Sequence, residues 1–427
     1  MKIYLILIAV SLLFVCCSSH DDDEIVPSEN PSKAELTVLI YMAADNNLYL
    51  TSNNDLNEIK EGSKSLNEAQ NLLVYVDDSL PSPPYIARVK DGQFVDSVSM
   101  EESFSADPQI LEKMVRYAHQ NYPAESYGLI LWGHCNGWII TNDTVSSRKK
   151  AYGLNTNEKE GENYYKYWMN IPSMAKAISS GMEGERLKFI FGDCCTFADI
   201  ETMYELRNNA DYLIGSPAEV PERGAPYQLV VPQLFSKDEL FLKNVIDIYF
   251  NYYKDLYVND EMSGYIYFNK NFGDLEGYSL PLVVIKTSEL EELAQATAKL
   301  LSTIPDKLTP DGTFLLEGMP YYDATSNERY SYDIIPPLKA NTSETDFNIW
   351  LKSFRKAVLY ANISTRWYSG VLKLRKEINN FDDNPDNYGA MGMFFPSHDY
   401  DATVPNWNKA IRQMEWNNVI RWEQYGW

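Results

Sequence analysis

The sequence contains few residues with reactive side chains: five cysteines and four histidines among 427 residues. Cys16 and Cys17 end an apolar run at the N-terminus, so only Cys135, Cys194 and Cys195 remain for the folded part of the chain. Three thiols are too few for a disulfide scaffold. A buried, inert cysteine is the commoner fate of a lone thiol, but an exported protein that keeps unpaired thiols suggests a task for them.

Basic residues are also scarce. The chain has 37 Lys and Arg residues against 60 Asp and Glu residues, which leaves a formal net charge of -23 at pH 7. This balance argues against nucleic acid as a partner, because a phosphate backbone requires a basic face. The surplus carboxylates either attract cationic peptides or form a solvated acidic surface that binds no ligand. With 45% hydrophobic and 23% charged residues, the chain is typical of globular proteins and long enough for two domains or one elaborated domain.

Long hydrophobic runs are absent apart from one at the N-terminus. The apolar run from Tyr4 to Val15 has the length of a signal-peptide core and is short for a transmembrane helix. Cys17 follows it at the position of the lipidated cysteine in the lipobox of bacterial lipoproteins, which this segment resembles, and the acidic string 21–24 resembles the export tag of surface lipoproteins in Bacteroidetes. The alternatives are an ordinary secreted protein and an uncleaved anchor. We expect export to the outer membrane or cell surface, with the membrane contacted only through a lipid on Cys17.

Short apolar runs alternate with helical patterns over the first half of the chain. Residues 18–34, rich in Asp, Ser and Pro, precede them as a flexible tether. This order predicts an α/β fold with a mostly parallel sheet and helices on both faces. The predicted strands are 36–44, 71–78, 127–132, 187–191 and 210–216; the predicted helices are 107–121 and 171–180; a hairpin is predicted within 86–100, with Asp91 and Gly92 at its turn.

The second half of the chain admits two arrangements. Ser288 and Glu291 form the pattern of a capping box at the start of one helix. The predicted elements of the second half are a helix at 241–257, a strand and helix within 280–301, a helix at 346–361 and a strand at 388–396. These elements either extend the same sheet or form a satellite domain. We therefore divide the chain into a signal peptide (1–17), a tether (18–34), a core (35–235) and a C-terminal extension or satellite (236–427).

Two of the predicted strands end at reactive side chains. One runs into His134, and the next runs into Asp193, Cys194 and Cys195, after which a helical pattern begins. Ligands of parallel α/β sheets bind beyond the carboxyl ends of the strands. A helix N-terminus after Cys195 would stabilise its thiolate and lower its pKa, and a histidine can take up a proton and return it. Neighbouring strand residues face opposite ways, so the side chain of Cys194 should point into the core.

Three motifs, taken in order, resemble those of the clostripain-like cysteine peptidases. They are YMAADNNL, the strand that ends in His134 with Gly133 before it and Gly137-Trp138 after it, and DCC followed by a helix with Glu201 and Tyr204. The resemblance covers Leu36 to Tyr227, and a weaker similarity to the family is present in GAMGMFFP. It implies a caspase-like αβα sandwich, as in caspases, gingipains and legumains, and a His/Cys dyad without a third carboxylate. On this basis Cys195 is the nucleophile and His134 is the base.

The resemblance also implies how the oxyanion is stabilised. Backbone amides between Gly133 and Cys135, together with the amide of Cys195, would donate hydrogen bonds to it. The family usually has glycine directly after the histidine, whereas this chain has Cys135. A side chain at this position can shift the amide or crowd the substrate. Cys194 occupies the family's alanine position.

Peptidases of this family generally cut after Arg or Lys, which implies an acidic site that favours bidentate Arg over Lys. Asp193, Glu219 and Glu222 are the candidates, although Asp193 can instead accept backbone amides at the strand end and the other two can be solvated. Many relatives also mature by self-cleavage between the His and Cys strands. The cut sites that this chain offers, if they are more than an exposed basic loop, are Arg148, Lys149 and Lys150.

Two other interpretations stay open. The residues His134, Cys135, Cys194 and Cys195 are zinc-ligand types, but adjacent strand residues diverge, whereas zinc pairs normally have about two to four residues between them. We assign no metal; calcium helps some relatives, but no EF-hand-type loop is present. The second interpretation is a non-catalytic surface protein that binds peptides or glycans through some of its 31 Tyr and nine Trp residues. The favoured expectation is a monomeric cysteine endopeptidase without a cofactor, acting on peptide or protein substrates.

Overall fold

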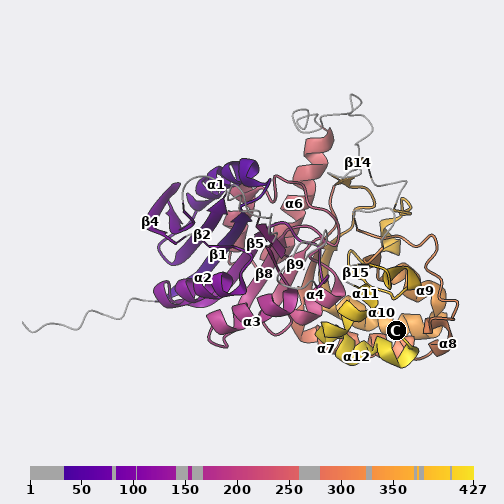
Figure 1. The fold of residues 1–427 in the computed structure, drawn as a ribbon. Coiled ribbons are helices and arrows are strands. Elements are labelled where there is room, and N and C mark those ends of the chain that lie inside the picture. Colours follow the sequence, from indigo (N-terminus) through magenta and orange to yellow (C-terminus); the bar gives the residue numbers. More distant parts are fainter. Residues whose placement is uncertain are drawn as a thin grey trace, which may run out of the picture. The chain divides into compact units, whose positions relative to one another are not determined.

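A mixed β-sheet forms the centre of the structure, which is a computed structural model of the chain. The structure describes residues 33–78, 83–101, 103–140, 152–155, 167–258, 279–323, 329–369, 373–374, 379–403 and 406–427. Within these residues, nine strands pair in the order β12-β10-β9-β8-β5-β1-β2-β3-β4 (Figure 1). They are β1 (Ala34–Ala44), β2 (Gln70–Asp78), β3 (Tyr85–Lys90), β4 (Gln93–Ser99), β5 (Ala124–Gly133), β8 (Leu187–Asp193), β9 (Ala210–Gly215), β10 (Leu282–Lys286) and β12 (Val358–Asn362).

The middle of this sheet is parallel. Strands β9, β8, β5, β1 and β2 pair in parallel, whereas β3 and β4 at one edge and β10 and β12 at the other pair antiparallel. The α/β fold with a mostly parallel sheet that the sequence predicts is confirmed. Lys33–Trp427 forms one compact unit, and β10 and β12 carry the same sheet into the C-terminal half of the chain.

Helices cover both faces of the sheet (Figure 1). In β1, Leu39 and Tyr41 point into one hydrophobic core and Val38 and Ile40 into the other, because successive strand side chains alternate between faces. The first core is covered by α2 (Pro108–Asn121), α3 (Ile171–Gly181), α4 (Ile200–Glu205), α7 (Leu290–Leu301), α10 (Glu344–Ala357) and α12 (Glu415–Ile420). The second core is covered by α1 (Tyr49–Ser63), α5 (Tyr227–Leu234) and α6 (Phe241–Val258).

Short elements complete the described part of the chain. The short helices are α8 (Pro305–Leu308), α9 (Ile335–Asn341) and α11 (Trp407–Ala410). Two-stranded ladders are formed by β6 (Tyr152–Asn155) with β7 (Tyr167–Met169), by β11 (Tyr332–Asp333) with β15 (Gly392–Met393), and by β13 (Tyr368–Ser369) with β14 (Lys373–Leu374). The predicted hairpin is confirmed as β3 and β4, and Asp91 and Gly92 at its turn have φ values of 51° and 78°, as a tight hairpin turn requires.

Several boundary predictions for the second half are wrong. The capping box at Ser288 does not form, because a 3-10 turn (Thr287–Glu289) precedes α7 and neither start has a side-chain cap. The helix predicted to continue to residue 361 ends at Ala357, where the chain turns into β12 and pairs with β10. The strand predicted at 388–396 is reduced to the two residues of β15. For the last two elements, pairing with a strand distant in the sequence accompanies the change: β12 pairs with β10, and β15 pairs with β11.

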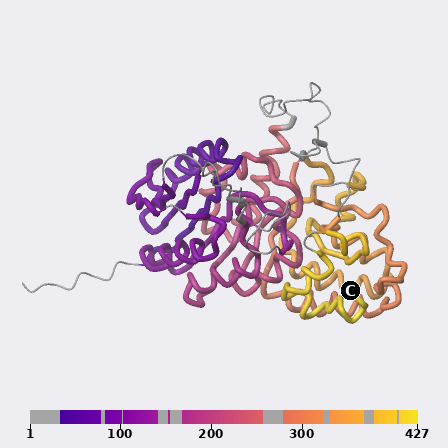
Figure 2. The backbone as a smooth tube through the Cα atoms, in the orientation of Figure 1, coloured from indigo at the N-terminus to yellow at the C-terminus, as the bar shows by residue number. Residues whose placement is uncertain are grey.

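The C-terminal end of the chain packs against α4. Figure 2 follows the chain from its indigo N-terminal strands to its yellow C-terminus. The rings of Trp416 and Tyr204 meet edge to face with centroids 5.4 Å apart, and the backbone N–H of Glu415 donates to Glu205 Oε2 at 2.8 Å. The short helix that follows the candidate nucleophile is thus supported by residues that lie more than two hundred positions later.

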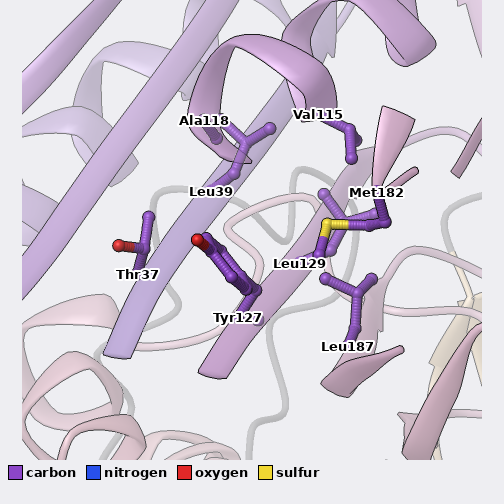
Figure 3. A pocket seen from close by; sticks show the side chains of 9 residues that line it. Thr37, Leu39, Val115, Ala118, Tyr127, Leu129, Met182 and Leu187 are labelled. Carbon is purple, nitrogen blue, oxygen red and sulfur yellow. The ribbon is translucent and has the colours of Figure 1, made fainter. Parts of the chain in front are cut away.

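A small apolar cavity lies at the amino ends of the parallel strands (Figure 3). Thr37, Tyr127 and Leu187, which lie near the starts of β1, β5 and β8, form part of its wall together with Met182. Its volume is about 10 Å³, which is enough for one water molecule at most. The cavity is therefore a packing void at the sheet edge opposite His134 and Cys195.

Two carboxyl groups are fully buried at the start of α4. Asp199 and Glu201 are each 0% exposed. Burial raises the pKa of Glu201 to about 8, although its Oε1 accepts a hydrogen bond from Phe394 N–H, and burial together with the charge of Glu201 raises the pKa of Asp199 well above its usual range. At neutral pH the folded protein therefore holds a proton on Glu201 that the unfolded chain, with a carboxyl pKa of about 4.3, has released.

We expect the Glu201→Gln variant to have a flatter dependence of stability on pH than the wild type. Between about pH 4.3 and pH 8 the folded state binds more protons than the unfolded state, so the free energy of unfolding falls as pH rises, by up to about 1.4 kcal/mol per pH unit for this group. Gln mimics the protonated acid and removes that slope. Urea unfolding at several pH values measures the difference, with the exposed Glu239→Gln as control. Equal slopes for Glu201→Gln and the wild type would contradict the prediction.

Candidate active site

The register of the parallel strands brings His134 and Cys195 to the same place on the sheet edge. In the pairing of β5 with β8, Trp132 lies opposite Asp193. His134 and Cys195 each follow two residues beyond these partners, on strands that are about 4.8 Å apart. Two segments that are distant in the sequence therefore end at the same sheet edge, one at His134 and the other at Cys195.

Cys195 lies in a turn and not at a helix N-terminus. Residues 194–199 connect β8 to α4, which begins only at Ile200. The Cys195 sulfur is half-buried and accepts a hydrogen bond from Val220 N–H at 3.3 Å. Burial and the nearby charge of Glu219 raise the pKa of Cys195 to about 12. The expectation that a following helix lowers the pKa of this thiol is therefore wrong, because the helix starts too late to act on it.

The turn after β8 is fixed by packing against two glycines. The ring of Phe197 covers Gly192 and Gly215, where an added Cβ would lie 2.2 Å and 2.8 Å from ring atoms. Thr196 has a φ of 50°, and its N–H donates to the carbonyl of Ala218 at 2.9 Å. Side chains larger than glycine in β8 and β9 would displace this ring, so both glycines help to position the thiol.

His134 is held by a residue that sequence analysis assigned no chemical role. Its Nε2 lies 2.8 Å from Asn47 Oδ1, just beyond β1, the neighbour of β5. Because an amide oxygen only accepts, this contact places a hydrogen on Nε2 and leaves Nδ1 as the basic nitrogen. Burial lowers the pKa of His134 to about 4. The imidazole is therefore neutral at pH 7 and able to accept a proton.

The role of Asn47 could have been predicted from its position. It follows an apolar strand, and this strand is the neighbour of the strand that ends before His134. The sequence predicts only a strand end and helix cap for residues 45–47. In the structure Asn46 makes that turn: its Oδ1 accepts from Leu48 N–H, and its Nδ2 donates to Ala43 O, both at 2.9 Å. Asn47 is thereby left to contact the histidine.

The residues around the candidate oxyanion site have special backbone or burial requirements. Gly133 has a φ of 146°, and a Cβ there would lie 3.0 Å from the carbonyl oxygen of Ala43. Cys135 is 2% exposed, and its carbonyl accepts from Thr196 Oγ1 at 3.5 Å. The side chain of Cys135 thus belongs to the core, and the expected crowding of substrate by this side chain does not arise in this conformation.

Asp193 lies beneath the loop that follows β9. Its Oδ2 accepts from Ala225 N–H at 2.9 Å and from Tyr227 Oη at 2.7 Å, and its Oδ1 accepts from Tyr249 Oη at 2.7 Å. The residue is 3% exposed, and burial raises the pKa of its carboxyl group. Asp193 therefore ties the loop to α5 and α6 and carries three hydrogen bonds within the protein.

The two other acidic candidates lie in different surroundings. Glu219 is half-buried, and its charge acts on the Cys195 thiol. Glu222 is exposed. The structure thus brings Glu219 close to the thiol and places Glu222 on the outside of the loop.

Two further acids lie near Asp193 and were missed by sequence analysis. Asp55 Oδ2 accepts from Trp132 Nε1 at 2.6 Å, and Glu58 Oε2 accepts from Tyr227 N–H at 3.1 Å. Burial raises the pKa of Asp55 to about 9 and that of Glu58 to about 7. Their spacing of three residues places both on one face of α1, a pattern that could have singled them out.

Metal ligation has no support in the described part of the chain, where no group of three or more His, Cys, Asp and Glu side chains is arranged to hold an ion. Cys194 is 1% exposed, as predicted for a core position. The residues Cys17, Arg148, Lys149 and Lys150 lie outside the described residues.

A sequence profile of the clostripain family matches residues 40–402. The chain belongs to the clostripain family. Clostripain from Hathewaya histolytica is 24% identical over 243 residues, which are 49% of this chain and 44% of clostripain, so the match spans less than half the length of that relative. The residues described above thus lie in the scaffold of a cysteine peptidase family.

Solved structures of the clostripain family share the fold. A secreted C11 cysteine protease from Bacteroides thetaiotaomicron, in complex with an irreversible peptide inhibitor, is 27% identical with a TM-score of 0.72 over 92% of this chain and 100% of its own. An inactive zymogen C11 protease from Parabacteroides distasonis is 24% identical with a TM-score of 0.66 over 92% of this chain and 99% of its own. The caspase-like layering that the sequence resemblance implies is confirmed.

Proposed function

We propose that the protein is a cysteine endopeptidase in which His134 and Cys195 form the catalytic dyad. The observation that carries this proposal is the strand register, which sets both residues two positions beyond the directly paired Trp132 and Asp193. The contact between Asn47 and His134 adds support, because it orients the ring. Membership of the clostripain family supports the same reaction class.

The reaction begins from a neutral pair. With the pKa of His134 lowered to about 4 and that of Cys195 raised to about 12 by burial, both groups are uncharged at pH 7. His134 takes the thiol proton as the sulfur attacks the substrate carbonyl, and backbone amides near Gly133 and Cys135 and at Cys195 stabilise the oxyanion. His134 then protonates the departing amine, and a water molecule that His134 deprotonates hydrolyses the thioester and restores the thiol.

The preferred cleavage site follows Arg or Lys. Glu219 beside the thiol supports this preference, since a half-buried carboxylate attracts a cationic side chain. Asp193, Asp55 and Glu58 add negative potential from beneath the loop when ionised. Glu222 is exposed on the loop, and its charge attracts basic peptides toward the site.

Fluorogenic peptides that end in Arg, Lys or neutral residues test this function. We expect cleavage after Arg and Lys that a thiol alkylator abolishes, and about a fivefold lower kcat/KM for Glu219→Gln on basic peptides, because a rim charge contributes on the order of 1 kcal/mol. Glu239→Gln, which removes an exposed acid elsewhere, is the matched control. Equal cleavage after neutral residues would refute the specificity, and no alkylation-sensitive cleavage would favour the non-catalytic binding protein.

The same site supports maturation by self-cleavage. Arg148, Lys149 and Lys150 lie between the strand that ends before His134 and the strand that ends before Cys195, and they match the proposed preference for basic residues. Cleavage at these bonds would leave both catalytic residues in one assembled protein, because β5 and β8 stay paired in the sheet. This step should depend on Cys195.

We also infer export and lipid anchoring at Cys17, at the outer membrane or cell surface. The Bacteroides thetaiotaomicron relative is described as secreted, and the described residues include no helix long and apolar enough to cross a membrane. Labelling of growing cells with an alkyne-tagged palmitate should mark the wild type and leave Cys17→Ala unmarked, because acylation needs this thiol. Equal labelling of both would end the assignment.

A further inference from the structure

An aromatic side chain to which the proposed reaction gives no role lies beside the His134 imidazole. The ring centroids of Trp168 and His134 are 6.5 Å apart, and the ring planes are tilted by 44°. Trp168 is half-buried, and its Nε1 atom is buried. The part of the indole that can meet a substrate is therefore hydrocarbon. The candidate site thus has an apolar surface next to the base.

The ladder of β6 and β7 holds Trp168 in this place. Met169, the next residue of β7, pairs with Tyr152 of β6 and is buried in the hydrophobic core. Successive strand side chains point to opposite faces, so Trp168 points away from the core that takes up Met169. The ladder is tied to the base itself, because Gly153 N–H donates to the carbonyl of His134 at 2.8 Å. The indole ring is therefore fixed relative to the imidazole.

The strand order separates Trp168 from the acidic loop that follows β9. Strands β9, β8, β5 and β1 are consecutive neighbours in the sheet. The loop after β9 approaches Cys195, whose sulfur accepts from Val220 N–H at 3.3 Å. The ladder that carries Trp168 lies over β5 and β1 instead, because the Tyr152 hydroxyl donates to a carbonyl group of each, at 3.0 Å and 3.2 Å. The acidic loop and the indole ring therefore lie on the two sides of the Cys195 and His134 pair.

We propose that Trp168 sets the specificity for the substrate residue directly after the cut, and that this residue is apolar and packs against the indole ring. This inference rests on the proposed peptidase function. In that reaction His134 protonates the departing amine, so the residue on the amine side of the cleaved bond lies beside His134, whereas the acyl side stays on Cys195. An apolar side chain gains free energy by covering the hydrocarbon of the ring, whereas a charged side chain gives up hydration there.

Two peptides that differ only in the residue after a single arginine, leucine in one and glycine in the other, test this inference. The wild type should cleave the leucine peptide with a kcat/KM at least about fivefold above that for the glycine peptide. Trp168→Ala should remove this preference, and Trp168→Phe, which keeps an aromatic ring, should retain most of it. Equal kcat/KM for the two peptides in the wild type, or an unchanged ratio in Trp168→Ala, would overturn the proposal.

The ratio of the two kcat/KM values separates specificity from a merely structural role, because loss of folded enzyme lowers both values equally and leaves their ratio unchanged. Leu240→Ala is the matched control and should keep the wild-type ratio. Leu240 is 47% exposed and lies close in sequence to Lys237, which pairs with Glu35 near the start of β1, at the opposite edge of the sheet. Urea unfolding verifies that each variant is folded. Cleavage of neither peptide by the wild type would instead refute the proposed function, and this inference with it.

Discussion

The Cys195→Ala variant is expected to lose at least about ten-thousand-fold in kcat/KM on Arg- and Lys-ended peptides, since no other group can form the thioester. Cys195 lies two residues beyond the end of β8, at the same sheet edge as His134, which follows β5, and it is half-buried. Removing it leaves the hydrogen bonds of the turn to Ala218 and Ser216 in place, so the fold should persist. Peptide hydrolysis and urea unfolding measure the two effects.

The adjacent thiol supplies a matched control for this prediction. Cys194→Ala removes a sulfur atom one residue away that is 1% exposed and points into the core. It should retain activity within about tenfold of the wild type under reducing conditions, because it removes packing and not the nucleophile. Equal hydrolysis by Cys195→Ala and the wild type would reject Cys195 as the nucleophile.

Gel analysis tests self-cleavage. The wild type should be clipped and Cys195→Ala should stay intact. An intact wild-type chain, or equal clipping of both proteins, would reject self-cleavage.

The Asp193→Ala variant is expected to lose about 3 to 5 kcal/mol of stability, the cost of leaving buried donors without their charged acceptor. Three donors depend on this carboxylate: the Ala225 N–H and the hydroxyl groups of Tyr227 and Tyr249. They connect β8 to the loop after β9 and to two helices on one face of the sheet. Urea unfolding should therefore begin at a lower concentration than for the wild type.

Asp193→Asn separates the structural role of this residue from an electrostatic one. Asn keeps the size and one acceptor oxygen, so it should cost less stability than Ala. Tyr249→Phe removes a single donor and provides a reference for one lost hydrogen bond, about 1 kcal/mol. The ratio of kcat/KM for Arg-ended over neutral peptides then reports the charge: a fall in Asp193→Asn indicates a direct effect on specificity. Unfolding of Asp193→Ala at the wild-type urea concentration would contradict the structural role.

The central strands could be predicted because their signal is local. Strands β1, β2, β5, β8 and β9 are continuous apolar runs, which is typical of parallel strands that are buried on both faces. The helices α2 and α3 have a helical apolar period and could be placed for the same reason.

Features that depend on distant partners could not be predicted in this way. The late start of α4 follows from Phe197 packing on Gly192 and Gly215, and the early end of α10 follows from pairing of β12 with β10. The contact of Asn47 with His134 joins residues from two different strand ends. None of these leaves a periodic pattern in the local sequence.

The sequence by itself determined which reactive groups the protein has: a histidine and a pair of cysteines at the ends of buried strands, in a family order that indicates a peptidase. Only the tertiary structure decided their relation and their protonation. The register of β5 with β8 aligns His134 with Cys195, and burial lowers the pKa of one and raises that of the other. Strand register and desolvation both arise from contacts between segments far apart in the chain, which a local sequence pattern does not contain.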